Sequence, residues 1–230
     1  MRDKSMDLSP ILISLKTACA AIVFTFILGM AAARLVTGLK NIWLKTLLDA
    51  LFTLPLVLPP TVMGFFLLYV FGVYRPIGRF FVEFFGIRVP FSWGATVLAA
   101  VVIAFPLMYR SARGAIEQVD NDIINAGRTL GMSENAIFFK VVLPNAKPGI
   151  ISGTVLAFAR GLGEFGATSM IAGNIAEKTR TLPLAVYSET AAGNMDKAYD
   201  YVLILVIIAF AAVTLLNLAG RDRRKMQRTG

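Results

Sequence analysis

The chain contains no histidine and a single cysteine, Cys19, among its 230 residues. Without histidine it cannot carry out histidine-based catalysis or build a Cys/His metal site, and one cysteine cannot form an internal disulfide. Charged residues are also scarce: they make up 16% of the sequence, whereas soluble domains carry about 25%. No G-x-x-x-x-G-K-[ST] segment is present, so the chain has no P-loop for ATP. These absences indicate an integral membrane protein rather than a soluble enzyme.

Hydrophobic residues make up 57% of the chain. Five apolar runs can be assigned as spans, since a membrane helix needs about 20 residues, and we expect an all-α polytopic membrane protein. The first run is longer than the apolar region of a cleaved signal peptide, so we interpret it as a span. The predicted spans are residues 11–33, 47–71, 93–108, 148–171 and 201–219.

Lysine and arginine are unevenly distributed between the two sides of the predicted bundle. The connections that follow the first, third and fifth spans hold 13 of them, and the opposite side holds eight. Because positive residues collect in the cytoplasm, we expect the N-terminus outside and the C-terminus inside, with residues 221–230 as a basic cytoplasmic tail. We interpret the net charge of +9 as this topology signal rather than as a surface for nucleic acid or anionic lipid.

Three connections are more than simple turns. Residues 110–147 form the long connection on the predicted cytoplasmic side, and residues 172–200 form the long outer one. Residues 75–90 mix aromatic side chains with arginine and glutamate, which fits either a short helix in the outer interface or a loose loop.

The cytoplasmic connection has the pattern of two helices joined by a corner. Gly131 suits the residue just past a helix end, because glycine adopts positive φ without strain. Ser133 can then cap a second helix, with Glu134 at its positive end. That helix would carry an apolar set that needs cover, either from the protein's own helices or from a groove on a partner. The set comprises Met132, Ile137, Phe138 and Phe139.

The second span contains the sequence TLPLVLPPTVMG, with prolines at positions 55, 59 and 60. Proline removes a backbone donor and clashes with the preceding turn, so a straight helix cannot continue through this stretch. The break is either a kink that serves packing or, as in many transporters, part of a transport site.

The fourth span contains a literal G-x-G-x-x-G, residues 161–166, but the preceding strand of a nucleotide-binding unit is missing, so we reject that function. A stripe of small residues at every fourth position can instead admit a neighbouring helix, or could face lipid by chance. The stripe is Gly149, Gly153, Ala157 and Gly161. A second row at the same spacing, on another face of a continuous helix, is Leu156, Arg160, Glu164 and Thr168.

Arg160 and Glu164 lie about 18 Å and 24 Å along this span if it begins near residue 148. Arginine near the middle of a membrane costs about 2.5–3.5 kcal/mol, so it should face the bundle interior or a watery path. One turn of spacing lets the two residues pair. The pair either holds helices together or lines a path for an anion, and these roles are compatible. A neutralised arginine would attract an oxyanion without trapping it.

The segment NAGRTLGMSENAIFFKVVLP resembles the cytoplasmic loop of ABC importer permeases, where E-A-A is followed after three residues by Gly and after nine more by Ile-x-Leu-Pro. Asn125, Gly127 and Val141 depart from that pattern. The resemblance implies that the loop docks onto a separate ATPase subunit, which would use ATP and Mg, while this chain binds no cofactor. The loop residues so implied are Asn125, Ala126, Gly127, Arg128, Thr129, Leu130, Gly131, Met132, Ser133, Ile137, Phe138, Phe139, Leu143 and Pro144.

Together with FARGLGEFGAT and LPLVLPPTVMG, the later TRTLPLAVY makes residues 8–220 similar to the molybdate-type permeases of oxyanion ABC importers. That family implies one permease domain in the cell membrane, a homodimer, an ATPase subunit and an extracytoplasmic binding protein that meets residues 172–200, with no nucleic acid and no metal site. Candidate pathway or gate residues are Pro55, Pro59, Pro60, Thr61, Arg160, Glu164, Phe165, Gly166 and Thr168.

The sequence therefore predicts a non-enzymatic molybdate permease. The GEFGA element is shared with sulfate and tungstate permeases, so a permease for sulfate/thiosulfate or for tungstate is the alternative. Two further classes fit less well. A membrane-embedded enzyme would need more than Glu164 for acid–base chemistry, and a structural assembly protein would not explain an apolar cytoplasmic loop helix.

Overall fold

The computed structural model describes residues 7–226, apart from the side chains of residues 216, 217 and 219–226. The predicted basic tail comprises residues 221–230. Its side chains, and residues 227–230 altogether, lie outside the described part of the chain. The described chain is helical and contains no strand, which confirms the all-α class. Its elements are α1 (Ser9–Gly38), α2 (Ile42–Val57), α3 (Pro60–Phe71), α4 (Pro76–Phe85), α5 (Trp93–Glu117), α6 (Asn121–Thr129), α7 (Glu134–Ile137), the π-helical η1 (Phe138–Val142), α8 (Leu143–Leu162), α9 (Gly166–Ile171), α10 (Leu182–Ala191) and α11 (Met195–Met226).

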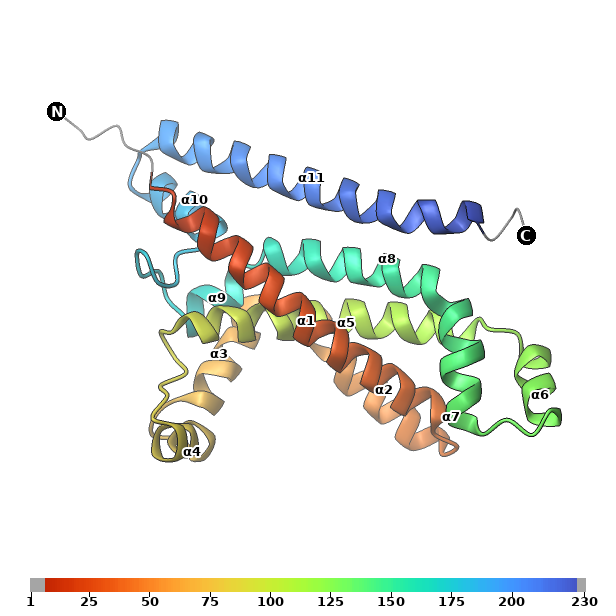
Figure 1. Ribbon diagram of the computed structural model, residues 1–230. Coiled ribbons are helices and arrows are strands. Elements are labelled where there is room, and N and C mark those ends of the chain that lie inside the picture. Colours follow the sequence, from red (N-terminus) through yellow and green to blue (C-terminus); the bar gives the residue numbers. More distant parts are fainter. Residues whose placement is uncertain (1–6, 227–230) are drawn as a thin grey trace.

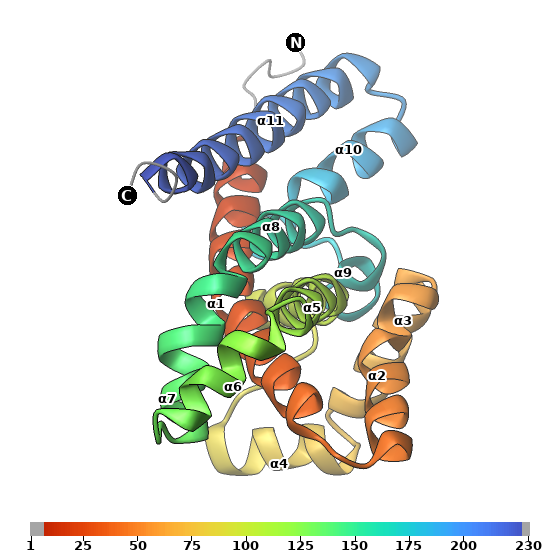
Figure 2. The ribbon, with the colours of Figure 1, turned by 90° about the vertical axis from the view of Figure 1, so that its right-hand side faces the viewer.

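Helix α5 occupies the centre of the bundle and packs most extensively on α1 and α8 (Figures 1 and 2). Its buried face is made largely of alanine, which lets neighbouring helices approach closely. Helix α11 lies on the outside of the bundle, where it contacts α8 and α10. The alanines of α5 with at most 2% of their surface exposed are Ala95, Ala99, Ala100, Ala104 and Ala112.

Polar side chains join the helices at the end of the bundle where α1 begins. The hydroxyls of Thr17 on α1 and Thr96 on α5 lie 3.0 Å apart, and the Ser14 hydroxyl accepts a hydrogen bond of 2.7 Å from the Leu182 amide of α10. Such bonds satisfy polar groups that would otherwise be buried without a partner in an apolar surrounding.

Within the described residues, four helices are long and apolar enough to cross a membrane, namely α1, α5, α11 and the run from Glu134 to Leu162. The pair α2 and α3 passes the same test together but is bent by 112°, as in a broken span or a re-entrant loop. The bend lies where Leu58 is extended and Pro59 and Pro60 follow, since neither proline can donate a helical hydrogen bond. The structure thus supports four to five spans and confirms the break in the second predicted one.

Several predicted boundaries are wrong. The span was expected to end at residue 108, yet α5 continues to Glu117 because the residues that follow contain no proline and a single glycine, Gly114, does not end a helix. Residues 110–117 therefore belong to a long helix and not to a loop. Helix α11 likewise begins at Met195 rather than at residue 201, and α10 occupies part of the outer connection.

Residues 76–85 form a helix, which decides between the helix and the loose loop that composition allowed. Helix α4 begins at Pro76 and ends at Gly86, whose φ of 64° is accessible to glycine at little cost. Figures 1 and 2 show α4 lying across the direction of α5, at the end of the bundle where α5 begins. This orientation is the one expected of an interfacial helix.

The stripe of small residues on α8 lies against α5. A Cβ atom added at Gly149 would lie 2.6 Å from the Cβ of Ala115, and one at Gly153 would overlap Ser111. Ala157 is 1% exposed, and Gly161 faces Ala100 and Ala104 of α5. These positions are small because the two helices are in direct contact there.

We expect Gly149→Ala to lower the midpoint of thermal unfolding by about 3–10 °C, because the added methyl group would force apart α5 and α8. Gly114→Ala is the matched control: Gly114 lies in α5 with open space where its Cβ would be. That variant should keep or raise the midpoint through its higher helix propensity. Equal midpoints, measured on the purified chains in detergent, would contradict this account of the contact.

Candidate functional site

Two helix breaks meet inside the bundle. Helix α8 ends at Leu162, and α9 begins at Gly166 beside the start of α3. A Cβ atom added at Gly166 would lie 2.9 Å from the Cβ of Pro60, and one at Gly64 would lie 2.7 Å from the Cα of Ala167. The bend in the second span and the break in the fourth are therefore packed directly on each other.

The break after Leu162 corrects the prediction of one continuous helix over residues 148–171. Glu164 lies in the link between α8 and α9, where its Oε1 atom accepts a hydrogen bond of 2.7 Å from the Ala167 amide. This carboxylate takes the place of the missing helical acceptor. The predicted row through Leu156 and Thr168 is consequently wrong, since Leu156 is 54% exposed and Thr168 is 1% exposed.

Arg160 and Glu164 do form an ion pair. Nη1 of Arg160 lies 2.8 Å from Oε2 of Glu164, and the glutamate side chain is 1% exposed while the arginine side chain is 31% exposed. The contact is not aligned as a hydrogen bond, because Oε2 has no hydrogen-bond partner among the described residues. A buried carboxylate with one hydrogen bond needs a nearby cation. Part of the Arg160 side chain therefore remains accessible.

The other pathway candidates lie on α2, α3 and α9 or in the links beside these helices. Pro60 and Thr61 lie against Gly166, and the ring of Phe165 lies 5.1 Å from the ring of Tyr187 in α10. Pro59 caps the start of α3, whereas Pro55 lies inside α2, before the bend. The structure therefore brings Pro60 and Thr61 to the break that follows Leu162.

The segment between α5 and α8 contains the predicted corner. Gly131 follows the end of α6 with φ of 74°, and the Ser133 hydroxyl accepts a hydrogen bond of 3.3 Å from the Ala136 amide. The Met132 amide donates to the Gly127 carbonyl at 3.1 Å, which closes the turn. A Cβ atom at Gly127 would lie 3.2 Å from Ile137, so α6 and α7 pack closely.

Arg128 fastens this corner through its side chain. It donates to both oxygens of Glu134, at 2.7 Å and 3.2 Å, and to the side-chain oxygen of Asn125 at 3.0 Å. The hydrogen bond from Arg128 lowers the pKa of Glu134 below its ordinary value. The stabilisation is therefore present near neutral pH and is lost as the pH falls through that lowered pKa. The Thr129 hydroxyl donates to the Asn125 carbonyl at 3.0 Å.

The apolar residues of the segment are divided between the bundle and the surface. Ile137 is 2% exposed and belongs to the core, while Leu130 and Phe139 are 80% and 57% exposed. The guanidinium of Arg34 lies over the rings of Phe138 and Phe139, at 4.3 Å and 5.0 Å. Leu143 and Pro144 begin α8 directly after the π-helical turn. The bundle thus covers part of the segment and leaves an apolar edge.

A charged network between α2 and α5 was missed from the sequence. Arg113 forms ion pairs with Asp49 and with Glu117, and Glu117 also pairs with Lys45 at 2.9 Å. The Tyr109 hydroxyl donates to Asp49 at 2.9 Å. The sequence feature that could have predicted this network is the spacing of four between Tyr109, Arg113 and Glu117, which places them on one helix face.

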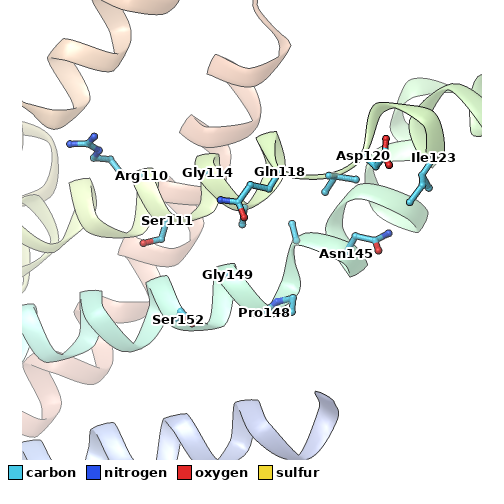
Figure 3. Close-up of a pocket in the computed structure, with 13 residues that line it drawn as sticks. Arg110, Ser111, Gly114, Gln118, Asp120, Ile123, Asn145, Pro148, Gly149 and Ser152 are labelled. Atoms are coloured by element: carbon cyan, nitrogen blue, oxygen red, sulfur yellow. The ribbon is translucent and has the colours of Figure 1, made fainter. Parts of the chain in front are cut away.

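An open pocket of about 590 Å³ lies between α5 and α8 at the same end of the bundle. Figure 3 shows its polar side chains, with Ser111 on α5, Gln118 just past the end of α5, and Asn145 and Ser152 on α8. Arg110 is the basic residue of the lining, and Asp120 lies where α6 begins. The surface between α5 and α8 is therefore hollowed where α5 leads into α6.

Comparison with known proteins assigns residues 18–223 to the family described as binding-protein-dependent transport system inner membrane component. The molybdenum transport system permease protein ModB of Escherichia coli K12 is 43% identical, covering 96% of this chain and 95% of the relative. ModB of Haemophilus influenzae is 38% identical, covering 96% and 97% of the two chains. ModB of Mycobacterium tuberculosis is 40% identical, covering 92% and 78%.

Solved structures share the fold at low sequence identity. A chain of the MetNI methionine ABC transporter, in an inward-facing conformation, superposes with a TM-score of 0.74 at 18% identity, covering 94% of this chain and 95% of the other. A bacterial ABC transporter involved in the import of alginate gives a TM-score of 0.76 at 13% identity, covering 94% and 79%. At these identities the likeness concerns the fold alone.

We expect Asp49→Asn and Arg113→Gln to be coupled in their effect on thermal stability. Because the pair is partly exposed, the coupling free energy from a double-mutant cycle should be about 1 kcal/mol. Arg79→Gln and Glu83→Gln, which remove a more exposed pair on α4, provide the control with a coupling near zero. The midpoints of unfolding of the purified single and double variants measure both cycles. Additive effects at Asp49 and Arg113 would show that the network does not hold α2 to α5.

Proposed function

The chain belongs to the family of binding-protein-dependent transport system inner membrane components, and we propose that it is the transmembrane permease subunit of an ABC importer for molybdate. The observation that carries this conclusion is its 43% identity to a ModB permease over 96% of the chain. The fold agrees, because a helical bundle with two broken spans packed together is typical of transport sites in membranes. The chain is accordingly a multi-pass protein of the cytoplasmic membrane.

The working complex contains further subunits in this proposal. ATP and Mg are bound by a separate ATPase subunit, which the corner at Gly131 contacts through the exposed apolar side chains of Leu130 and Phe139. An extracytoplasmic binding protein delivers the anion to the connection of residues 172–200, and two copies of the chain enclose the path. Figure 1 supports the opposite placement of the two ends, since α1 begins at one end of the bundle and α11 ends at the other. The excess of lysine and arginine on the side of α6 and α7 supports a cytoplasmic position for these helices.

Arg160 and Glu164 are the groups we assign to the anion path. The carboxylate is buried and holds the break between the helices, so its charge neutralises most of the arginine's charge. The exposed edge of the guanidinium can still donate hydrogen bonds to a passing oxyanion. A full positive charge would bind a divalent anion too tightly, whereas conduction requires weak binding. Sulfate/thiosulfate or tungstate is the alternative cargo for the same arrangement.

Reconstitution with an ATPase subunit and a binding protein tests the proposed function. We expect ATP hydrolysis to be stimulated by the binding protein loaded with molybdate, and molybdate to accumulate inside the vesicles. Sulfate offered under the same conditions is the matched control for the cargo. Stimulation by sulfate and not by molybdate would overturn the cargo, and failure to associate with any ATPase subunit would overturn the permease role.

Glu164→Gln tests the neutralised arginine. The amide oxygen can still accept the bond from the Ala167 amide, so α9 should keep its start, while Arg160 gains a full net charge. We expect transport to slow by about tenfold and the apparent affinity for the anion to rise, because release becomes harder. Glu83→Gln on α4 removes an exposed carboxylate and should leave both values unchanged. If Glu164→Gln also left transport and its anion dependence unchanged, the pair would be structural only.

A further inference from the structure

A second groove is formed by the turn between α1 and α2, the end of α5, and helices α6 and α7. Its volume is about 800 Å³. None of the proposed transport steps uses it. The charged residues of its lining are Arg34, Lys40, Lys45, Glu117, Arg128 and Glu134.

The groove carries two positive charges more than its carboxylates can balance. Lys45 lies 2.9 Å from Glu117, and Arg128 lies 2.7 Å from Glu134, so these four charges cancel in pairs. The cations that remain are Arg34 and Lys40. Lys40 is exposed and forms no ion pair among the described residues.

Arg34 is held in place by neutral partners. Its guanidinium lies over the ring of Phe138 at 4.3 Å and donates a hydrogen bond to the side-chain oxygen of Asn135. Neither partner removes its charge, and a planar guanidinium fixed in this way is well suited to bind phosphate oxygens. Lys40, three residues before Trp43, can supply a second, more mobile contact.

Helix α2, which supplies Lys45 to the groove, also carries exposed apolar side chains. The first turns of α2 expose Ile42, Trp43 and Leu47, at 67%, 82% and 66%. Tryptophan is typical of the boundary between acyl chains and headgroups, and α2 begins directly after the cationic turn. A ligand that combined a phosphate with hydrocarbon would match both features, whereas free phosphate would match the cations alone.

We propose that this groove binds the phosphate headgroup of an anionic phospholipid, with Arg34 and Lys40 as its contacts and the acyl chains against the exposed start of α2. Basic recesses between membrane helices on the cytoplasmic side are suited to such headgroups. The inference goes beyond transport. It depends on the proposed function only through the orientation of the chain, which decides the leaflet that supplies the lipid. Since α6 and α7 form one wall, a bound phosphate would tie the cytoplasmic corner to the membrane surface.

Trp43 provides a direct measurement, because the chain has only one other tryptophan, Trp93. The full chain with Trp93→Phe is reconstituted in phosphatidylcholine bilayers that contain brominated phosphatidylglycerol or brominated phosphatidylcholine, whose bromines quench nearby tryptophan fluorescence. We expect phosphatidylglycerol to be preferred at Trp43 by about tenfold, and Lys40→Gln to reduce this preference by about fivefold. Symmetric vesicles make the measurement independent of the orientation, the cargo and the ATPase subunit.

Two controls distinguish lipid binding in the groove from a general attraction of anionic lipid to the basic side of the bundle. Lys147→Gln removes an exposed positive charge on the same side of the bundle but outside the groove, and it should leave the preference unchanged. The chain with Trp43→Phe reports from Trp93, at the other end of α5, and should show no preference.

Three results would overturn the proposal. The first is equal quenching by the two lipids at Trp43. The second is an equal loss of preference in Lys147→Gln, which would indicate an attraction to the whole basic face. The third is loss of the preference when millimolar inorganic phosphate or the ATPase subunit is added, which would identify a free anion or a protein partner as the occupant.

Discussion

Backbone hydrogen bonding inside a bilayer is the constraint on which the rest of this structure depends, because hydrocarbon offers no partner for a freed amide or carbonyl. Two spans are nevertheless broken. In the second span, Pro59 and Pro60 have no amide hydrogen to satisfy, and the Val62 amide donates to the Pro59 carbonyl at 2.9 Å. In the fourth, the Glu164 carboxylate accepts from the Ala167 amide. Packing the breaks on each other through Gly64 and Gly166 excludes lipid from both.

The charges at the break follow from this constraint. A carboxylate that caps α9 from within the bundle must be buried, and Glu164 is 2% exposed as a whole residue. Its negative charge would be costly alone, so a cation must come close, and Arg160 on the last turns of α8 supplies it. The arginine is only partly covered, which leaves donors at the one place where both broken spans meet. A structural requirement thereby produces a site suited to an anion.

The sequence predicted those features that depend on local chemistry. Pro59 and Pro60 predicted the bend, and Gly131 with Ser133 predicted the corner, because each acts within a few residues, whereas Pro55 lies inside α2. The break after Leu162 was not foreseen, since an apolar stretch with glycines reads equally as a continuous helix. The network of Asp49 and Arg113 was missed for a related reason: the partners are 64 residues apart, and only the packing of α2 on α5 joins them.

The helical run from α7 through η1 to α8 connects the corner at Gly131 to the break after Leu162. Residues from Glu134 to Leu162 form a continuous run of 29 helical residues, which turns sharply where the π-helical η1 and Pro144 lead into α8 (Figures 1 and 2). Beyond that turn, the 20 residues of α8 extend over about 30 Å. Its packing on α5 through Gly149 and Gly153 allows little bending, because close contact between helices resists small displacements. A displacement at the start of α8 would therefore move this helix as a body, including Arg160 in its last turn. The Gly163–Phe165 link is the first interruption of the helix after Arg160, so such a displacement would be absorbed there, beside the proposed anion path.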